Sequence, residues 1–192
     1  MLNIEEDQVN MTSIIETERL LLRFWKKEDV EPYYQINQDP KVIQYLRSSL
    51  TMDQVVEFVK SVNIHGDKYG YALWAAQFKE ASELIGFIGL QFTDWKSHFT
   101  PAVEVGWRLG SQYWGKGYAT EGASALLRYG FNRCGLKEII SFTVPANVRS
   151  IRVMEKIGLK QDINGSFAHT KLELSHQLSK HVLYRIARED FK

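Results

Sequence analysis

A glycine loop between a predicted strand and a predicted helix carries the clearest chemical information in the sequence. The loop reads Gln112-Tyr-Trp-Gly115-Lys-Gly117, and its two glycines let the backbone turn tightly and approach a ligand closely. Residues 103–109 before the loop alternate apolar and polar side chains, which predicts a half-buried strand. From Tyr118 the apolar residues recur with helical spacing, so the free N–H groups of the first helical turn would point into the loop. This arrangement predicts a binding site for an anion such as a phosphate.

Two nucleotide-binding motifs match this loop only in part. Residues 110–116 fit the opening of the triphosphate-binding motif G-x-x-x-x-G-K, but Gly117 stands where that motif needs Ser or Thr to hold Mg²⁺. The dinucleotide fingerprint G-x-G-x-x-G fails as well, because Thr120 stands at its third glycine. A nucleotide triphosphatase is therefore kept as an alternative enzyme, and it predicts Mg²⁺-dependent binding of ATP.

A second block agrees with the loop. Residues 138–144 form a β-branched, apolar run that Pro145 ends, and Asn147 then opens a stretch with helical spacing that Gly158 can terminate. The Q-x-x-G-x-G loop and this second block resemble the two signatures of the GCN5-related N-acetyltransferases, the GNAT superfamily. Across residues 14–187, the element order, the opening TERLLLR and the late KHVLYRIAR resemble the branch that acetylates the N-terminal alanine of ribosomal proteins.

This resemblance implies a single α/β domain. Its central sheet would be mixed and mostly antiparallel, with a splayed pair of strands and flanking helices. We expect the domain to span residues 13–190, after a loose polar leader at residues 1–12. Besides the elements already named, we expect strands at 17–23, 71–78, 84–92, 159–163 and 181–187, and helices at 27–37 and after the capping box Thr51-x-x-Gln54.

The resemblance also implies acetyl-CoA as the acetyl donor, and no metal. In the family, backbone amides of the loop hold the diphosphate, and exposed amides of the preceding strand bind the pantetheine arm and polarise the thioester carbonyl. Four cations could attract the polyanionic cofactor or simply form solvated faces: Arg108, Lys116, Arg149 and Arg152. The residues expected to bind the cofactor are Trp107, Leu109, Gln112, Tyr113, Trp114, Gly115, Lys116, Gly117, Ala119 and Asn147.

Acetyl transfer requires a base that frees the amine and an acid that protonates the departing thiolate. Glu104 is the expected base, because it lies on the strand face opposite the apolar valines; the alternative is a surface carboxylate that pairs with Arg108. Met154 stands where many family members carry the tyrosine that acts as acid, and a thioether cannot donate a proton. Ser150 is the nearest donor, and the alanine-specific branch is similar in having serine there. Alternatively, Ser150 only supports its helical turn.

The acceptor amine is less constrained by the sequence. The resemblance suggests the N-terminal alanine of a ribosomal protein, and an amino acid, a polyamine or an antibiotic amine are the alternatives. A degenerate module that binds an acyl-CoA without turnover is a further alternative, for which Met154 is the warning sign. Aromatic side chains of this kind belong to a core more often than to a groove, but those expected near an acceptor groove are Trp25, Tyr33, Tyr34, Trp95, Phe167 and His169.

The composition excludes several classes of protein. The chain has 192 residues, of which 44% are hydrophobic and 24% charged, and its net charge of +1 gives no electrostatic footprint for nucleic acid. A single cysteine, Cys134, excludes an intrachain disulfide and suits a reducing compartment. The opening residues are acidic where a secretion signal is basic, and the apolar run 84–90 is too short to cross a bilayer. We therefore expect a cytoplasmic protein without a membrane partner; a homodimer is left open.

Overall fold

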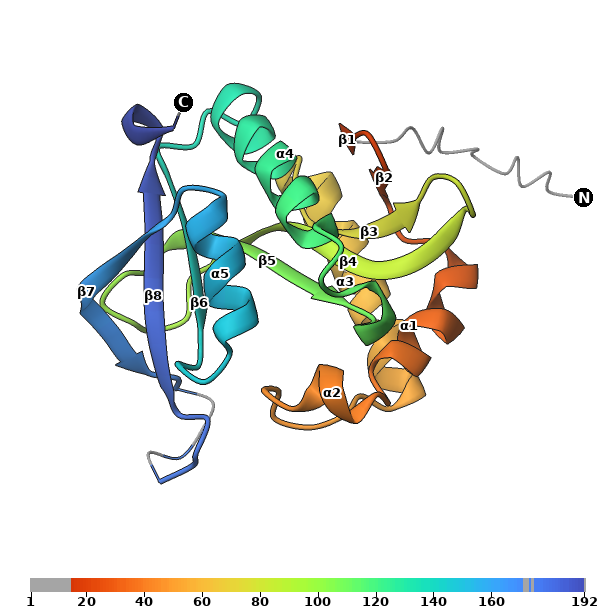
Figure 1. Ribbon diagram of the computed structural model, residues 1–192, viewed down its shortest axis with the longest axis horizontal. Coiled ribbons are helices and arrows are strands. Elements are labelled where there is room, and N and C mark those ends of the chain that lie inside the picture. The colour runs from red at the N-terminus through yellow and green to blue at the C-terminus, as the bar shows by residue number, and fades with distance from the viewer. Residues whose placement is uncertain (1–14, 171–172, 174, 192) are drawn as a thin grey trace, which may run out of the picture.

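One mixed sheet runs through the part of the chain that the computed structural model describes, which comprises residues 15–170, 173 and 175–191. The predicted leader at 1–12 lies outside these residues. The strands are β1 (Ile15–Glu16), β2 (Leu20–Arg23), β3 (Leu73–Phe78), β4 (Glu83–Thr93), β5 (Ala102–Leu109), β6 (Glu138–Thr143), β7 (Lys160–Ala168) and β8 (Lys180–Ala187). They lie in the order β1-β2-β3-β4-β5-β6-β8-β7 (Figure 1). Every neighbouring pair is antiparallel except β5 and β6, which confirms the mixed, mostly antiparallel sheet.

Five α-helices flank this sheet within the described residues. They are α1 (Val30–Ile36), α2 (Pro40–Ile43), α3 (Met52–Tyr69), α4 (Tyr118–Asn132) and α5 (Val148–Lys156). The predicted capping box is confirmed at the start of α3, where the side chain of Thr51 accepts from Gln54 N and the Gln54 side chain accepts from Thr51 N. No helix of the described chain is long and apolar enough to span a membrane.

The strand register assigns the side chains of the sheet to two faces. Glu104 on β5 pairs with Gln91 on β4 and with Ile140 on β6, and residues that pair in register point to the same side. Side chains two residues apart along a strand also share a face. The face that carries Glu104, named the Glu104 face below, therefore also carries Arg108 and Phe142.

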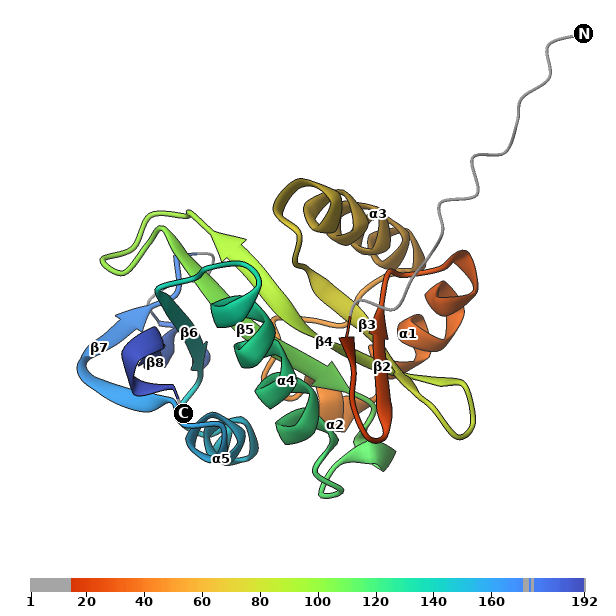
Figure 2. The same ribbon diagram turned by 90° about the horizontal axis from the view of Figure 1, so that it is seen from above.

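Helices α4 and α5 lie together on the opposite face, named the α4 face (Figure 2). Gly122 of α4 lies so close to Ile88 on β4 that a Cβ at this glycine would approach Ile88 Cδ1 to 2.5 Å. The absence of a side chain at Gly122 therefore lets α4 pack tightly on the sheet. Helix α1 packs on the Glu104 face, where the rings of Tyr33 and Phe87 have centroids 6.2 Å apart.

Strands β5 and β6 separate from each other, which confirms the predicted splayed pair. Their parallel pairing is registered at one position, Glu104 with Ile140. Just beyond it, Ser141 Oγ donates a hydrogen bond to the carbonyl oxygen of Val105 at 2.8 Å. Toward Leu109 the backbone of β5 is left available to a ligand on that side.

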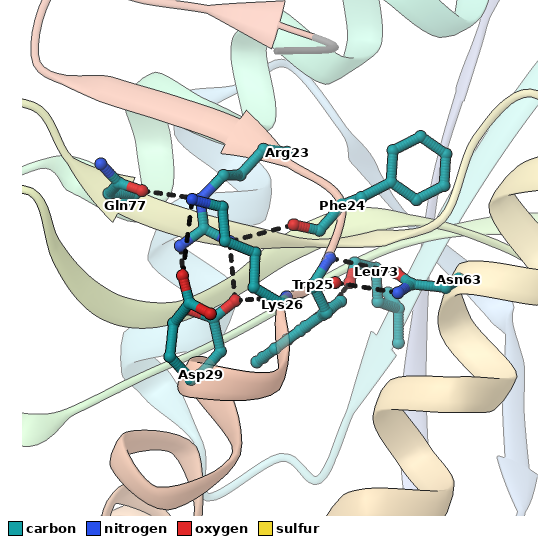
Figure 3. Close-up of polar contacts among 9 residues, drawn as sticks. Arg23, Phe24, Trp25, Lys26, Asp29, Asn63, Leu73 and Gln77 are labelled. Carbon is teal, nitrogen blue, oxygen red and sulfur yellow. Dashed lines mark hydrogen bonds and ion pairs between the residues drawn. The ribbon is translucent and has the colours of Figure 1, made fainter. Parts of the chain in front are cut away.

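A buried ion pair attaches the segment before α1 to the sheet (Figure 3). Arg23 at the end of β2 is 6% exposed and Asp29 is 3% exposed. The Arg23 guanidinium donates to Asp29 through two parallel bonds, Nη1 to Oδ2 at 2.6 Å and Nη2 to Oδ1 at 2.8 Å. Arg23 Nε donates to Gln77 Oε1 on β3 at 2.6 Å, and Lys26 N donates to Asp29 Oδ2 at 2.7 Å. The pair therefore joins β2, β3 and the start of α1.

Three predicted elements differ from the structure. The strand predicted at 17–23 begins only at Leu20, as β2, because Thr17 N donates to the carbonyl oxygen of Leu20 and closes a turn between β2 and the short strand β1 that precedes it. The helix predicted at 27–37 begins as a 3-10 turn before α1. The strand predicted at 159–163 continues to Ala168 as β7, past an irregularity in its pairing with β8 that hides the alternation of side chains.

Candidate active site

The loop between β5 and α4 has the shape that an anion requires. Gly115 and Gly117 adopt left-handed backbone conformations, with φ of 75° and 84°, a region that residues with a Cβ rarely occupy. No side chain caps the N-terminus of α4. Its first N–H groups are therefore available to a bound anion, whose charge the helix dipole also favours.

Two residues that sequence reasoning did not single out support this loop from behind. Arg19 Nη1 donates to the carbonyl oxygen of Lys116 at 3.0 Å, while its Nε donates to Glu121 Oε2 at 2.6 Å. Glu121 also accepts from Thr17 Oγ1 at 2.6 Å. Arg19 and Glu121 are about a hundred positions apart in the chain, so no local pattern in the sequence could reveal their contact.

Cations and an indole surround the mouth of the loop. The Arg149 guanidinium lies 5.1 Å from the ring centroid of Trp114, and Trp114 Nε1 donates to the carbonyl oxygen of Leu109 at 2.8 Å. Lys41 and Arg149 line a small hollow together with Ser111, Trp114 and Gly115. This concentration of positive charge fits the phosphates of a nucleotide-bearing ligand.

A cavity of about 950 Å³ connects the two faces of the sheet at the splay between β5 and β6. From the loop and the α4 face it is lined by Trp107, Leu109, Tyr113, Trp114, Gly115, Gly117, Tyr118, Ala119, Asn147, Ser150 and Met154. From the Glu104 face and the segments around it, its lining includes Leu46, Leu73, Phe87, Trp95, Glu104, Arg108, Phe142, His169 and His181.

Most of the predicted site residues therefore meet in one cavity, but two do not line it. Gln112 folds back onto Gly110, where a Cβ would lie 2.9 Å from Gln112 Oε1. Lys116 Nζ lies 6.0 Å from the ring centroid of Tyr113. The Gln112 side chain thus packs within the loop, and the Lys116 side chain lies beside it. The backbone of Lys116 is held in place by the hydrogen bond from Arg19.

Glu104 sits half-buried in this cavity with no hydrogen bond or ion pair to any described residue. Burial raises the pKa of its carboxyl group from 4.5 to about 8, because the charged form loses hydration that nothing replaces. The alternative pairing with Arg108 is not formed. Arg108 Nη1 instead donates to Asn37 Oδ1 at 2.6 Å and to Tyr33 Oη at 3.3 Å.

The start of α5 presents Ser150 to the cavity from the α4 face. Asn147 caps the helix, since its Oδ1 accepts from Ser150 N at 3.3 Å, and its Nδ2 donates to Thr143 Oγ1 at 3.1 Å. The cap is therefore made by Asn147, and the Ser150 hydroxyl makes no hydrogen bond within the described chain. Met154 is buried on the same helix and adds a thioether to the lining.

The aromatic residues expected near an acceptor groove separate into two groups. Trp25 and Tyr33 are 2% and 0% exposed and belong to the hydrophobic core. Trp95 and His169 line the cavity. Phe142 also lines the cavity, and sequence reasoning did not single it out. It lies two residues after Ile140 in a predicted strand, so the two side chains share a face.

Within the described chain no three His, Cys, Asp or Glu side chains gather closely enough to hold a metal ion. The cavity joins an anion cradle to a half-buried carboxylate.

The sequence profile of the Acetyltransferase (GNAT) domain matches residues 19–160. The chain belongs to the GNAT family. It is therefore an acetyl-CoA-dependent N-acetyltransferase, and the open α4 N-terminus and the two left-handed glycines are the features of this structure that fit the cofactor's diphosphate.

Relatives support the assignment to the GNAT family. The chain is 33% identical over 150 residues to the N-acetyltransferase YnaD of Bacillus subtilis, itself uncharacterised, covering 77% of this chain and 83% of the relative. A GNAT-family acetyltransferase from Bacillus anthracis superposes with a TM-score of 0.74 at 30% identity, covering 91% of this chain and 98% of that one. The ribosomal-protein-S5-alanine acetyltransferase from Vibrio fischeri shares the fold, with a TM-score of 0.72, 20% identity and coverage of 94% and 99%.

Substitution of Gly117 by glutamate should abolish cofactor binding by this GNAT enzyme. The new side chain would adopt an unfavourable left-handed backbone conformation and place a negative charge at the anion cradle. We expect the CoA-induced rise in melting temperature to disappear and Kd to increase at least about 100-fold, which corresponds to about 2.7 kcal/mol.

Gly135→Glu is the matched control, because Gly135 also has a left-handed φ, of 65°, but lies after α4 and away from the loop. Both variants should lose stability, and only Gly117→Glu should lose CoA binding, measured by isothermal titration calorimetry. Normal CoA affinity in Gly117→Glu would show that the diphosphate binds elsewhere.

Proposed function

We propose that this GNAT enzyme acetylates a primary monoamine, and that the α-amine of a peptide or protein beginning with alanine is its acceptor. The observation that carries this proposal is the charge of the cavity. Glu104 is the only carboxylate among the described residues that line it, whereas the cations include Lys41, Arg47 and Arg108. A polyamine or an aminoglycoside carries several ammonium groups and would need several carboxylates.

Glu104 is suited to act as the base. Its pKa of about 8 lies close to that of an N-terminal amine, about 7.7 to 8.0 in model peptides. An ammonium that enters the cavity favours the carboxylate form of Glu104 by direct attraction. Proton transfer from the ammonium to Glu104 is then nearly balanced in free energy, which is the condition under which a general base works best at neutral pH.

The two catalytic side chains face the reaction from opposite sides of the sheet. Glu104 takes a proton from the ammonium, and the freed amine forms the new C–N bond at the thioester carbonyl that acetyl-CoA supplies. The backbone amides of β5 along the splay stabilise the developing oxyanion. Ser150, on the α4 face, donates its hydroxyl proton to the sulfur as the C–S bond breaks. Water then carries the second proton of the new amide nitrogen back to Ser150, and Glu104 releases the proton it took to solvent.

Alanine is the first acceptor to test because of the resemblance of the chain to the alanine-specific branch, and because the Vibrio fischeri neighbour is named for that activity. Asn147 at the mouth of the splay would bind the pantetheine amides, and the Gly115–Gly117 turn would bind the diphosphate. We place the reaction in the cytoplasm, where the single cysteine of the chain would stay reduced.

A thiol-release assay with acetyl-CoA tests this proposal. Peptides that begin with Ala, Ser or Met are compared with spermidine, free lysine and an aminoglycoside at equal concentration. We expect kcat/KM to be highest with the alanine peptide and at least about tenfold lower with the polycations. Preference for spermidine or the aminoglycoside would overturn the monoamine assignment, and CoA binding without turnover of any amine would favour the binding-module alternative.

A further inference from the structure

A group of partly exposed rings stands beside Glu104, outside the hydrophobic core. Its members come from four segments that are distant in the sequence: the β4–β5 connection, β6, the end of β7 and β8. None of its tryptophan and phenylalanine side chains belongs to the core cluster or packs against it. Folding of the main core therefore does not explain why these rings are gathered. The rings are those of Trp95, Phe99, Phe142, Phe167, His169 and His181.

The group has an inner and an outer layer. Trp95, Phe142, His169 and His181 line the cavity and are named the aromatic pocket. Within it, the rings of Trp95 and His169 are stacked, with centroids 5.0 Å apart and planes at 21°. This stacked pair forms part of the cavity wall.

Phe99 and Phe167 do not line the cavity and instead support the aromatic pocket from outside. Phe167 stacks on His181 with centroids 5.4 Å apart, and Phe99 meets Trp95 edge to face at 5.5 Å. The two phenylalanines also contact each other at 4.8 Å. Rings fixed by such a second layer are pre-organised, so that a ligand that binds against them has little side-chain ordering to bring about.

The aromatic pocket contains no Asp, Glu, Lys or Arg side chain. Burial lowers the pKa of His181, even though its hydrogen bond to the carbonyl oxygen of Ser179 acts in the opposite direction. Among the described residues that line the cavity, Glu104 is the only one with a carboxylate. A ligand held here thus meets one carboxylate that can bind an ammonium and a wall of aromatic rings.

The strand register places these two features close together. Glu104 pairs with Ile140, and Phe142 lies two residues farther along β6 on the same face, about 7 Å along the strand. His181 and Phe167 are paired across β8 and β7 on the Glu104 face as well. The spacing suits an amine separated from an aromatic ring by a few single bonds.

We propose that the aromatic pocket binds a planar aromatic group of the acceptor while the amine of the same acceptor meets Glu104. The acceptors are thereby narrowed to primary monoamines in which a short linker joins the nitrogen to an aromatic ring. A free arylalkylamine and a peptide whose second residue is aromatic share this chemistry. The inference rests on the proposed function, since it concerns the acceptor of the same transfer reaction.

The test compares two matched pairs of acceptors, 2-phenylethylamine with propylamine and an Ala-Phe peptide with an Ala-Gly peptide. For the wild-type enzyme we expect the ring-bearing member of at least one pair to have a kcat/KM at least about tenfold higher. The pair that shows the preference distinguishes a free amine from a peptide. Equal kcat/KM within both pairs would overturn the inference.

Trp95→Ala should lower the preference for the ring to near onefold, because kcat/KM should fall for the ring-bearing acceptor and much less for its ring-free partner. Phe142→Leu should lower the preference for the ring more weakly. Tyr69 on α3 belongs to a separate group of rings, so Tyr69→Leu should leave this preference unchanged. A CoA-induced thermal shift in each variant shows that the cofactor site is intact. If Trp95→Ala lowered turnover of all acceptors equally, the rings would be structural and the inference wrong.

Failure of this inference differs from failure of the proposed function. Wild-type turnover of the ring-free amines at undiminished kcat/KM would refute only the aromatic specificity. Absence of turnover with every monoamine, despite CoA binding, would refute the proposed function and the inference with it.

Discussion

Glu104→Gln is expected to lower kcat/KM for an alanine-initiated peptide by about 100- to 10,000-fold below pH 8, the range that loss of a general base produces. Below this pH the acceptor is mostly an ammonium, and Glu104 is the only carboxylate in the described lining of the cavity that could accept its proton. Above it, solvent supplies free amine, so the ratio of wild-type to variant kcat/KM should fall. Cofactor affinity should change little.

The pH at which this ratio falls should depend on the acceptor. An acceptor with a lysine-like amine, whose pKa is about 10.4, should keep a high ratio to a correspondingly higher pH. Glu80→Gln is the control, because Glu80 is an exposed carboxylate in the turn between β3 and β4. A ratio that is the same at every pH would mean that Glu104 positions the acceptor and does not remove its proton.

The elevated pKa of Glu104 can be checked without any acceptor. Its carboxyl group has a pKa of about 8 in the folded protein against 4.5 ordinarily, so the folded state binds more protons than the unfolded state between these values. The stability associated with protonated Glu104 is fully present below pH 4.5 and is lost as pH rises through 8. The melting temperature of Glu104→Gln relative to wild type should therefore rise from pH 5 to pH 9. The free energy of unfolding of Glu104→Gln relative to wild type should increase by about 1 to 3 kcal/mol over this range. This is less than the full pKa shift implies, because water reaches the half-buried group.

The sequence predicts those parts of the site whose signals are local. Alternation in residues 103–109, glycines at 115 and 117 and the helical period from Tyr118 each need only neighbouring residues, and the structure has a strand, a left-handed turn and a helix there. The Asn147 cap is similarly local, because its side chain bonds to an N–H three residues on.

Contacts between distant segments could not be predicted in this way. The sequence allowed an ion pair between Glu104 and Arg108, but Arg108 donates to Asn37, which is 71 positions away. Glu104 is left without a partner by this distant contact, and its raised pKa is a consequence of tertiary packing that periodicity does not encode. The aromatic pocket is of the same kind, since its four rings meet only after β6, β7 and β8 have paired.

Asp29→Ala is expected to have the largest effect on stability, because it would leave a buried guanidinium without its counter-charge. Arg23 directs two bonds at the Asp29 carboxylate, and both side chains are nearly inaccessible to water (Figure 3). Removing one member of a buried ion pair typically lowers the free energy of unfolding by about 3 to 5 kcal/mol. Thermal and denaturant unfolding should therefore show a markedly lower melting temperature and midpoint.

Two controls separate the uncompensated charge from loss of packing. The double variant Arg23→Met and Asp29→Leu removes both charges and should recover much of the lost stability, since buried ion pairs can be replaced by apolar side chains of similar size. Glu57→Ala breaks an exposed ion pair with Lys60 on α3 and should change the melting temperature little. If Asp29→Ala lowered the melting temperature as little as Glu57→Ala does, water would have to reach the Arg23 guanidinium in solution. The attachment of the segment before α1 to the sheet would then depend on contacts other than this ion pair.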